Sequence, residues 1–121
     1  MNYVILILFC HFVADFIYQT DEMAKNKSKS LYWLSEHILA YSLVMFNILL
    51  PVLILCGESV KNIIIFVLLN AVLHFITDYF TSKESSKLYA KGDVHNFFVV
   101  IGIDGFIHQI TLILTYNYIF N

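Results

Sequence analysis

Four long apolar runs, joined by short polar segments, make up nearly the whole chain. They cover about residues 3–19, 32–55, 62–80 and 95–119. A helix needs roughly 20 mostly apolar residues to cross a bilayer, and each run reaches or approaches that length. The pattern therefore predicts an all-α fold, a four-helix transmembrane bundle that forms a single integral membrane domain over residues 1–121.

Composition agrees with a membrane setting and narrows the possible partners. Of the 121 residues, 60% are hydrophobic and only 13% are charged, which is too few charges for a soluble domain of this size. We expect the lipid bilayer as a partner and no nucleic acid, because the net charge is -2 and no arginine is present to form a basic face. Cys10 and Cys56 lack a paired motif, so we interpret both as buried apolar residues.

The lysines predict how the helices are oriented. Six of the seven lie in the polar segments 20–31 and 81–94, which follow the first and third runs. Short loops rich in lysine stay in the cytoplasm. We therefore expect a multi-pass protein of the cell (inner) membrane, with both lysine-rich segments in the cytoplasm and both termini outside it.

Ionisable residues form stripes along three of the predicted helices. A spacing of four residues places side chains on one helix face, one turn apart. The stripes are His11, Asp15 and Gln19 in the first run, Asn70, His74 and Asp78 in the third, and Asp104 with His108 in the fourth. At 1.5 Å of rise per residue, the stripes fall in the half of each helix nearer the lysine-rich segments. We expect a layer of histidines beside a layer of aspartates.

These stripes point to a metal site. Charged groups inside a bilayer cost several kcal/mol each and normally face a bundle interior, where they pair or bind something. No lysine lies inside an apolar run, so we expect protonated histidines or a divalent ion to neutralise the carboxylates. Imidazole and carboxylate suit zinc first, with manganese or iron as alternatives. The predicted ligands are His11, Asp15, His74, Asp78, Asp104 and His108; for any single pair, a structural hydrogen bond is the other interpretation.

A series of motifs runs through the chain: His11-Phe-Val-Ala-Asp15-Phe, Gln19-Thr-Asp-Glu-Met23-Ala-Lys-Asn-Lys27, His37, His74-Phe-Ile-Thr-Asp78, and Asp104 with His108. In type and order they resemble domain of unknown function 3307, small membrane proteins of bacteria and their phages. The chain departs from that pattern after Asp104, where Gly105 stands in place of the expected glutamine and Gln109 follows His108. The resemblance implies no activity. A looser likeness, in residue types alone, is to membrane-bound metal-dependent hydrolases.

The leading functional prediction is metal-dependent hydrolysis of a phosphate or ester at the cytoplasmic membrane surface. In this hypothesis Asp15, Asp78 and Asp104 are catalytic, since a carboxylate that the ion does not need can act as general base. The residues expected to meet an anionic lipid or another phosphorylated substrate are Gln19, Lys25, Lys27 and His37. Two other classes stay open: a small metal-ion or proton carrier, and a non-enzymatic phage or bacterial membrane protein that binds a host partner. A homo-oligomer is compatible with each.

The predicted orientation can be tested with single cysteines. Glu58, Ser28 and Leu88 are each replaced by cysteine in a chain whose own two cysteines are changed to alanine. A thiol reagent that does not cross membranes, added to intact cells, should label position 58 and spare positions 28 and 88, because the lysine-rich segments face inward. Labelling at 28 without labelling at 58 would reverse the orientation.

Overall fold

Helices account for all the regular structure in residues 2–121, the part of the chain that the computed structural model describes. They are α1 (Val4–Phe12), the π-helical turn η1 (Val13–Ile17), α2 (Asp21–Asn26), α3 (Leu31–Leu55), α4 (Val60–Ala90) and α5 (Val94–Phe120). No strand occurs among these described residues. The all-α prediction is confirmed.

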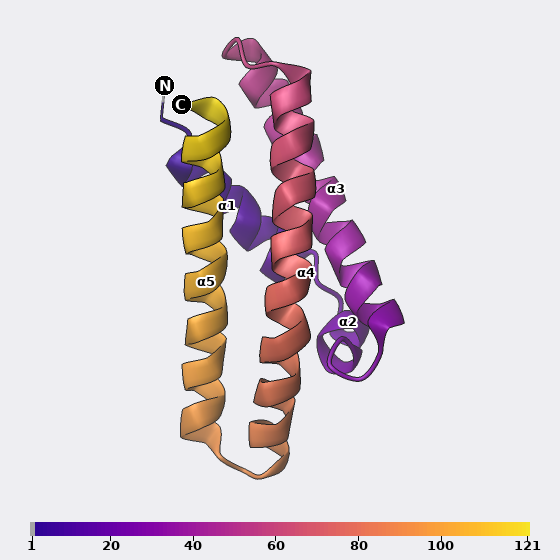
Figure 1. Ribbon diagram of the computed structural model, residues 1–121. Helices are drawn as coiled ribbons and strands as arrows, with labels where there is room; N and C mark the ends of the chain where they lie inside the picture. The colour runs from indigo at the N-terminus through magenta and orange to yellow at the C-terminus, as the bar shows by residue number, and fades with distance from the viewer. Residues whose placement is uncertain (1) are drawn as a thin grey trace.

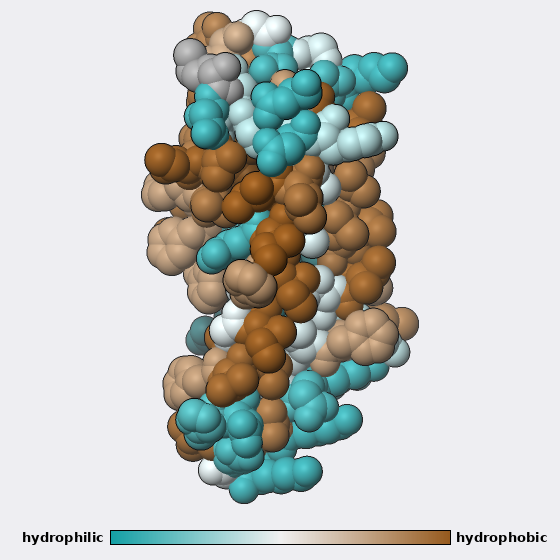
Figure 2. Space-filling model, turned by 60° about the vertical axis from the view of Figure 1, so that its left-hand side comes forward, coloured by the Kyte–Doolittle hydropathy of each residue, from teal (hydrophilic) through white to brown (hydrophobic). Residues whose placement is uncertain are grey.

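Three of these helices, α3, α4 and α5, are long and apolar enough to cross a membrane, and Val4–Ile17 is a shorter apolar helix. On the face shown in Figure 2, apolar side chains cover most of the middle of the molecule and hydrophilic ones gather at its two ends. Large apolar side chains such as Ile5, Leu68 and Phe106 are more than half exposed, as expected where lipid rather than water surrounds a helix. These are the features of a membrane protein.

Helix α4 packs between α3 and α5. In Figure 1, α5 runs antiparallel to α4 on one side, α3 lies on the other, and α1 crosses behind them. Contacts join α4 to both of its neighbours and α1 to both α3 and α5. The two termini and the turn between α3 and α4 lie at one end, which we call the terminal end. The α4–α5 turn lies at the opposite end with α2 towards it; we call this the lysine end, after segments 20–31 and 81–94.

Local sequence explains where the helices begin and end. Four helices start after a residue whose side chain accepts a hydrogen bond from a first-turn N–H group, namely Thr20, Ser30, Ser59 and Asp93. Such capping satisfies an N–H group that the helix itself leaves unpaired. Gly57 and Gly92 follow α3 and α4 with φ angles of 90° and 75°, a conformation that favours glycine.

Helix α4 continues beyond the third apolar run, which ends near residue 80, and reaches Ala90. The polar residues that follow the run include no glycine or proline before Gly92, so nothing in them breaks a helix. The apolar pattern marks only the part of α4 that a bilayer can cover. Its last turns, with the first turns of α5, extend the hairpin at the lysine end (Figure 1).

The first helix ends differently from the apolar pattern. After Phe12 it widens into the π-helical turn η1, in which the N–H of Tyr18 donates to the carbonyl of Val13 over 3.0 Å. The helix stops at Ile17, so Gln19 lies beyond it. Single π turns are rare and are frequent at functional sites. This one contains Asp15.

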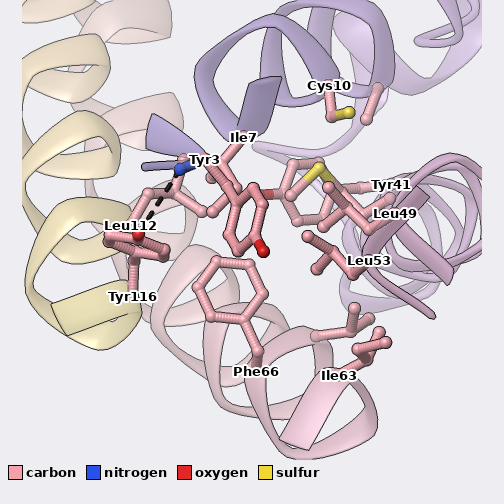
Figure 3. Packing of buried hydrophobic residues seen from close by; sticks show 13 residues of the cluster. Tyr3, Ile7, Cys10, Tyr41, Leu49, Leu53, Ile63, Phe66, Leu112 and Tyr116 are labelled. Carbon is pink, nitrogen blue, oxygen red and sulfur yellow. Dashed lines mark hydrogen bonds between the residues drawn. The ribbon is translucent and has the colours of Figure 1, made fainter. Parts of the chain in front are cut away.

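A cluster of buried apolar side chains fills the terminal half of the molecule. Side chains from α1, α3, α4 and α5 converge there (Figure 3), and the backbone N–H of Tyr3 donates to the Tyr116 hydroxyl over 3.3 Å. Cys10 is buried in this cluster, as expected. Cys56 is exposed, so its predicted burial is wrong, because it falls in the turn after α3.

Two neighbouring isoleucines of α4 allow a matched test of this packing. Ile63 is fully buried in the cluster, whereas Ile64 is 40% exposed. Ile63→Ala should lower the free energy of unfolding by roughly 2 kcal/mol through lost packing. Ile64→Ala should change it little, because lipid or detergent replaces the contacts. Reversible unfolding in detergent measures both, and equal effects would show that the core is elsewhere.

Candidate metal centre

Seven histidine and aspartate side chains from different helices meet in the lysine half of the molecule. They are His11, Asp15, His37, His74, Asp78, Asp104 and His108. All are buried except Asp104, whose side chain is 19% exposed. The polar stripes of three helices thus converge as their spacing suggests. Asn70 does not join them and instead exchanges hydrogen bonds with Thr115 towards the terminal end.

Four of these residues form a central group. Each of Asp15, His37, His74 and Asp78 offers one ligand atom, and the four atoms lie within 4.8 Å of one another. His37 Nε2 is 3.0 Å from Asp15 Oδ1 and 3.3 Å from Asp78 Oδ2. His74 Nε2 is 3.3 Å from the same Asp15 oxygen and 3.4 Å from Asp78 Oδ1. Two imidazoles and two carboxylates therefore face one point.

A second group adjoins the first and shares Asp15. It consists of Asp15, Asp104 and His108, again with ligand atoms within 4.8 Å of one another. His108 Nε2 lies 3.3 Å from Asp104 Oδ2 and 3.0 Å from Asp78 Oδ1, so His108 also links the two groups. The Thr81 hydroxyl donates to the other oxygen of Asp104 and holds that carboxylate in place. The arrangement offers ligands for one ion or for two neighbouring ions.

The central group fits a divalent ion better than a closed network of hydrogen bonds. The Nε2 atoms of His37 and His74 lie 3.3 Å apart and both face carboxylate oxygens. Asp15 Oδ1 is buried with no hydrogen bond of suitable geometry. Buried polar atoms left unpaired are costly. An ion would accept lone pairs from the two Nε2 atoms and from Asp15 together.

His11 and His37 do not lie where the sequence suggests. His11 Nε2 is 3.7 Å from Asp15 Oδ2, and its Nδ1 is 3.4 Å from the Tyr41 hydroxyl. His11 therefore belongs to neither ligand group. It does lie in the expected histidine layer, with its ring tilted against two others and its ring centroid 5.8 Å from that of His74 and 5.4 Å from that of His108. His37, expected to contact substrate, is instead in the central group.

Lys27 reaches the site from outside the apolar runs. Its Nζ donates to Asp78 Oδ2 over 2.8 Å, and its side chain is only 17% exposed. The expectation that no lysine neutralises the carboxylates is therefore wrong, because a flexible four-carbon stem lets a loop residue enter the bundle. Burial lowers the pKa of Lys27, but the carboxylates of Asp78 and Asp15 outweigh it and raise the pKa above the usual value.

A cavity of about 720 Å³ opens beside the two ligand groups. It lies between η1 and α2 on one side and the lysine ends of α4 and α5 on the other, and it reaches Asp15 and Asp104. The predicted substrate residues Gln19, Lys25 and Lys27 all line it. The site therefore has access to the exterior on the lysine side.

Sequence reasoning missed the serines on the cavity wall. Ser82, Ser85 and Ser86 line the cavity from α4, together with Tyr89, and Lys29 lines it from the loop after α2. A signal existed for Ser82, because it continues the four-residue spacing of Asn70, His74 and Asp78. This signal was overlooked because the third helix was expected to end with its apolar run, near residue 80.

Comparison with known proteins identifies a family but no characterised relative. No curated protein and no solved structure matches the chain. The resemblance noted in the sequence is confirmed by one family model, which covers residues 3–121. The chain belongs to the family described as "Protein of unknown function (DUF3307)".

Proposed function

We propose that this protein is a membrane-embedded, metal-dependent hydrolase that acts on a phosphate or ester at the cytoplasmic membrane surface. Val4–Ile17 with α3, α4 and α5 would form a four-helix bundle in the cell membrane, with the lysine end in the cytoplasm. One observation carries the proposal: a buried group of two histidines and two aspartates adjoins an open cavity. Buried ionisable groups that converge on a cavity are characteristic of reactive sites.

The ligand roles follow from the distances. Asp15, His37, His74 and Asp78 would hold the ion, with zinc as the first choice for two imidazoles and two carboxylates and manganese or iron as alternatives. Asp104 and His108, with Asp15, would hold a second ion or act directly on the substrate. A bound divalent ion supplies a more acidic water and polarises the substrate oxygen.

Asp104 is best placed to act as the general base. It lines the cavity, is less buried than Asp78, and is oriented by Thr81 and His108. Hydrolysis joins the oxygen of a water molecule to the phosphorus or carbonyl carbon and breaks the bond from that atom to the ester oxygen. Asp104 would take a proton from the water and return it to the leaving oxygen.

Lys27 gives the site a cation of its own. Its ammonium group contacts Asp78, which is also an ion ligand in this proposal. If Asp78 held a metal ion, Lys27 would be able to turn into the cavity that it lines and pair with an anionic substrate. Lys27 would therefore pair with the carboxylates when no ion is bound and with the substrate when an ion is bound.

A carrier is the main alternative, and the terminal half of the bundle argues against it. A carrier needs polar groups that continue across the membrane. Between the site and the terminal end, the interior is filled by buried apolar side chains such as Ile7, Leu49 and Phe66. The hydrogen-bonded pair of Asn70 and Thr115 interrupts this packing without forming a path. A site open on one side favours the enzyme.

The metal content of single-residue variants distinguishes the proposed ligands from nearby histidines that do not bind the ion. His37→Ala and His74→Ala should each remove most of the bound ion, because each deletes one of four central ligands. His11→Ala should retain it, since His11 lies outside both groups, and exposed His95→Ala serves as a second control. Elemental analysis of protein purified in detergent, with unfolding curves to verify the fold, gives the result. Full occupancy in both His37→Ala and His74→Ala would end the metal proposal.

Hydrolysis is tested with Asp104→Asn, which keeps the hydrogen bond from Thr81 but cannot accept a proton. Turnover of chromogenic phosphate and carboxylic esters in detergent micelles should fall by about 10²- to 10⁴-fold, while the central ion stays bound. Glu84→Gln, an exposed carboxylate at the same end of α4, should retain full turnover. If none of the esters is cleaved by the metal-loaded parent, the hydrolase proposal fails.

A further inference from the structure

The lining of the cavity beside the metal groups contains two chemically different sets of side chains, which we call its polar wall and its apolar wall. Its polar wall carries Lys25, Lys27 and Lys29 together with Ser82. Its apolar wall is formed by Phe16 of η1 and by Phe97 and Ile101 of α5. A volume of about 720 Å³ is far more than a free phosphate ion needs and suits an organic ligand. The ligand that covers both walls is amphiphilic.

The polar wall carries side chains that can bind an anion and have no partner among the described residues. Among residues 2–121, no carboxylate lies within ion-pair distance of Lys25 or Lys29, whereas Lys27 is paired with Asp78. Ser82 is 8% exposed, and its hydroxyl oxygen is buried without a hydrogen-bond partner. Two free ammonium groups and an unpaired hydroxyl donor match the oxygens of a phosphate group.

The apolar wall continues onto the outer surface of the molecule. Phe16 is 59% exposed and Ile101 is 41% exposed, and both line the cavity. Among the described helices, α5 is contacted by α1 but not by η1 or α2. The cavity occupies the space that this leaves between η1 and α5. An apolar chain can therefore extend sideways from the cavity into the surrounding lipid.

We infer that the substrate of the proposed hydrolase is a lipid with an anionic phosphate headgroup, which enters the cavity sideways from the membrane. Its phosphate lies against Lys25, Lys29 and Ser82, and its chains run over Phe16, Phe97 and Ile101. The headgroup then reaches Asp15 and Asp104, which line the same cavity. This inference rests on the proposed function and adds the class of substrate.

Three ligands distinguish a lipid from its parts: short-chain phosphatidic acid, glycerol phosphate, which lacks the chains, and short-chain phosphatidylcholine, which lacks the net negative charge. Each is titrated into the metal-loaded protein in a neutral detergent, and the rise in melting temperature reports binding. Phosphatidic acid should bind at least tenfold more tightly than either of the others. Equal binding of glycerol phosphate would assign the cavity to a water-soluble phosphate and overturn the inference, and equal binding of phosphatidylcholine would overturn the charge selection.

Paired variants test the two walls separately. The double variant Lys25→Gln/Lys29→Gln should weaken phosphatidic acid binding about tenfold or more, whereas Lys83→Gln/Lys87→Gln, outside the cavity at the same end, should not. Ile101→Trp should obstruct the apolar wall and weaken binding, whereas Ile103→Trp, exposed on the same helix and outside the cavity, should not. Unchanged binding in both cavity variants would overturn the inference.

The binding and turnover measurements can refute the lipid substrate and the hydrolase independently of each other. Selective binding of phosphatidic acid without cleavage of any ester would uphold the lipid site and overturn the hydrolase. Cleavage of soluble esters without selective lipid binding would uphold the hydrolase and overturn the lipid substrate.

Discussion

The structure depends on the cost of placing carboxylates inside an apolar bundle. Asp15 and Asp78 are almost completely buried, and such groups need cations or hydrogen-bond donors close by. Imidazoles from α3, α4 and α5 surround them, and the ammonium group of Lys27 reaches Asp78 from the loop after α2. Every helix long enough to cross a membrane therefore contributes a group to the same point. The cluster ties together elements that apolar packing alone would allow to slide against one another.

The two halves of the fold differ in how their helices pack. In the terminal half, interlocking apolar side chains hold the four helices in register. In the lysine half the helices separate enough to leave a cavity beside the cluster, and the π turn η1 places Asp15 between the two ligand groups. Packing without polar groups resists water and ions, whereas an open polar half admits a ligand. The result is a buried histidine and aspartate cluster with a cavity on its lysine side only, among the described residues.

The proposed function rests on the cluster and the cavity lying next to each other. A buried ion pair by itself is weak evidence for function, since such pairs also serve structure. Here the buried groups exceed what mutual pairing can satisfy, and unpaired lysines and a serine line the space next to them. Charge, unpaired polar atoms and an apolar wall together define a ligand by its chemistry. They are the features from which we propose a phosphate-bearing lipid as the ligand.

The sequence by itself determined the helical class, the apolar segments and most of the polar cluster, because hydrophobic length and a four-residue spacing are local properties that a helix converts directly into faces. It also indicated the family through motifs along the chain. Only the tertiary structure decided that His37 lies at the centre and His11 beside it, that α4 continues to Ala90, and that Lys27 pairs with Asp78. The rotation of one helix against another, and the reach of a flexible side chain, depend on packing between distant segments. Spacing along a single helix does not encode either of them.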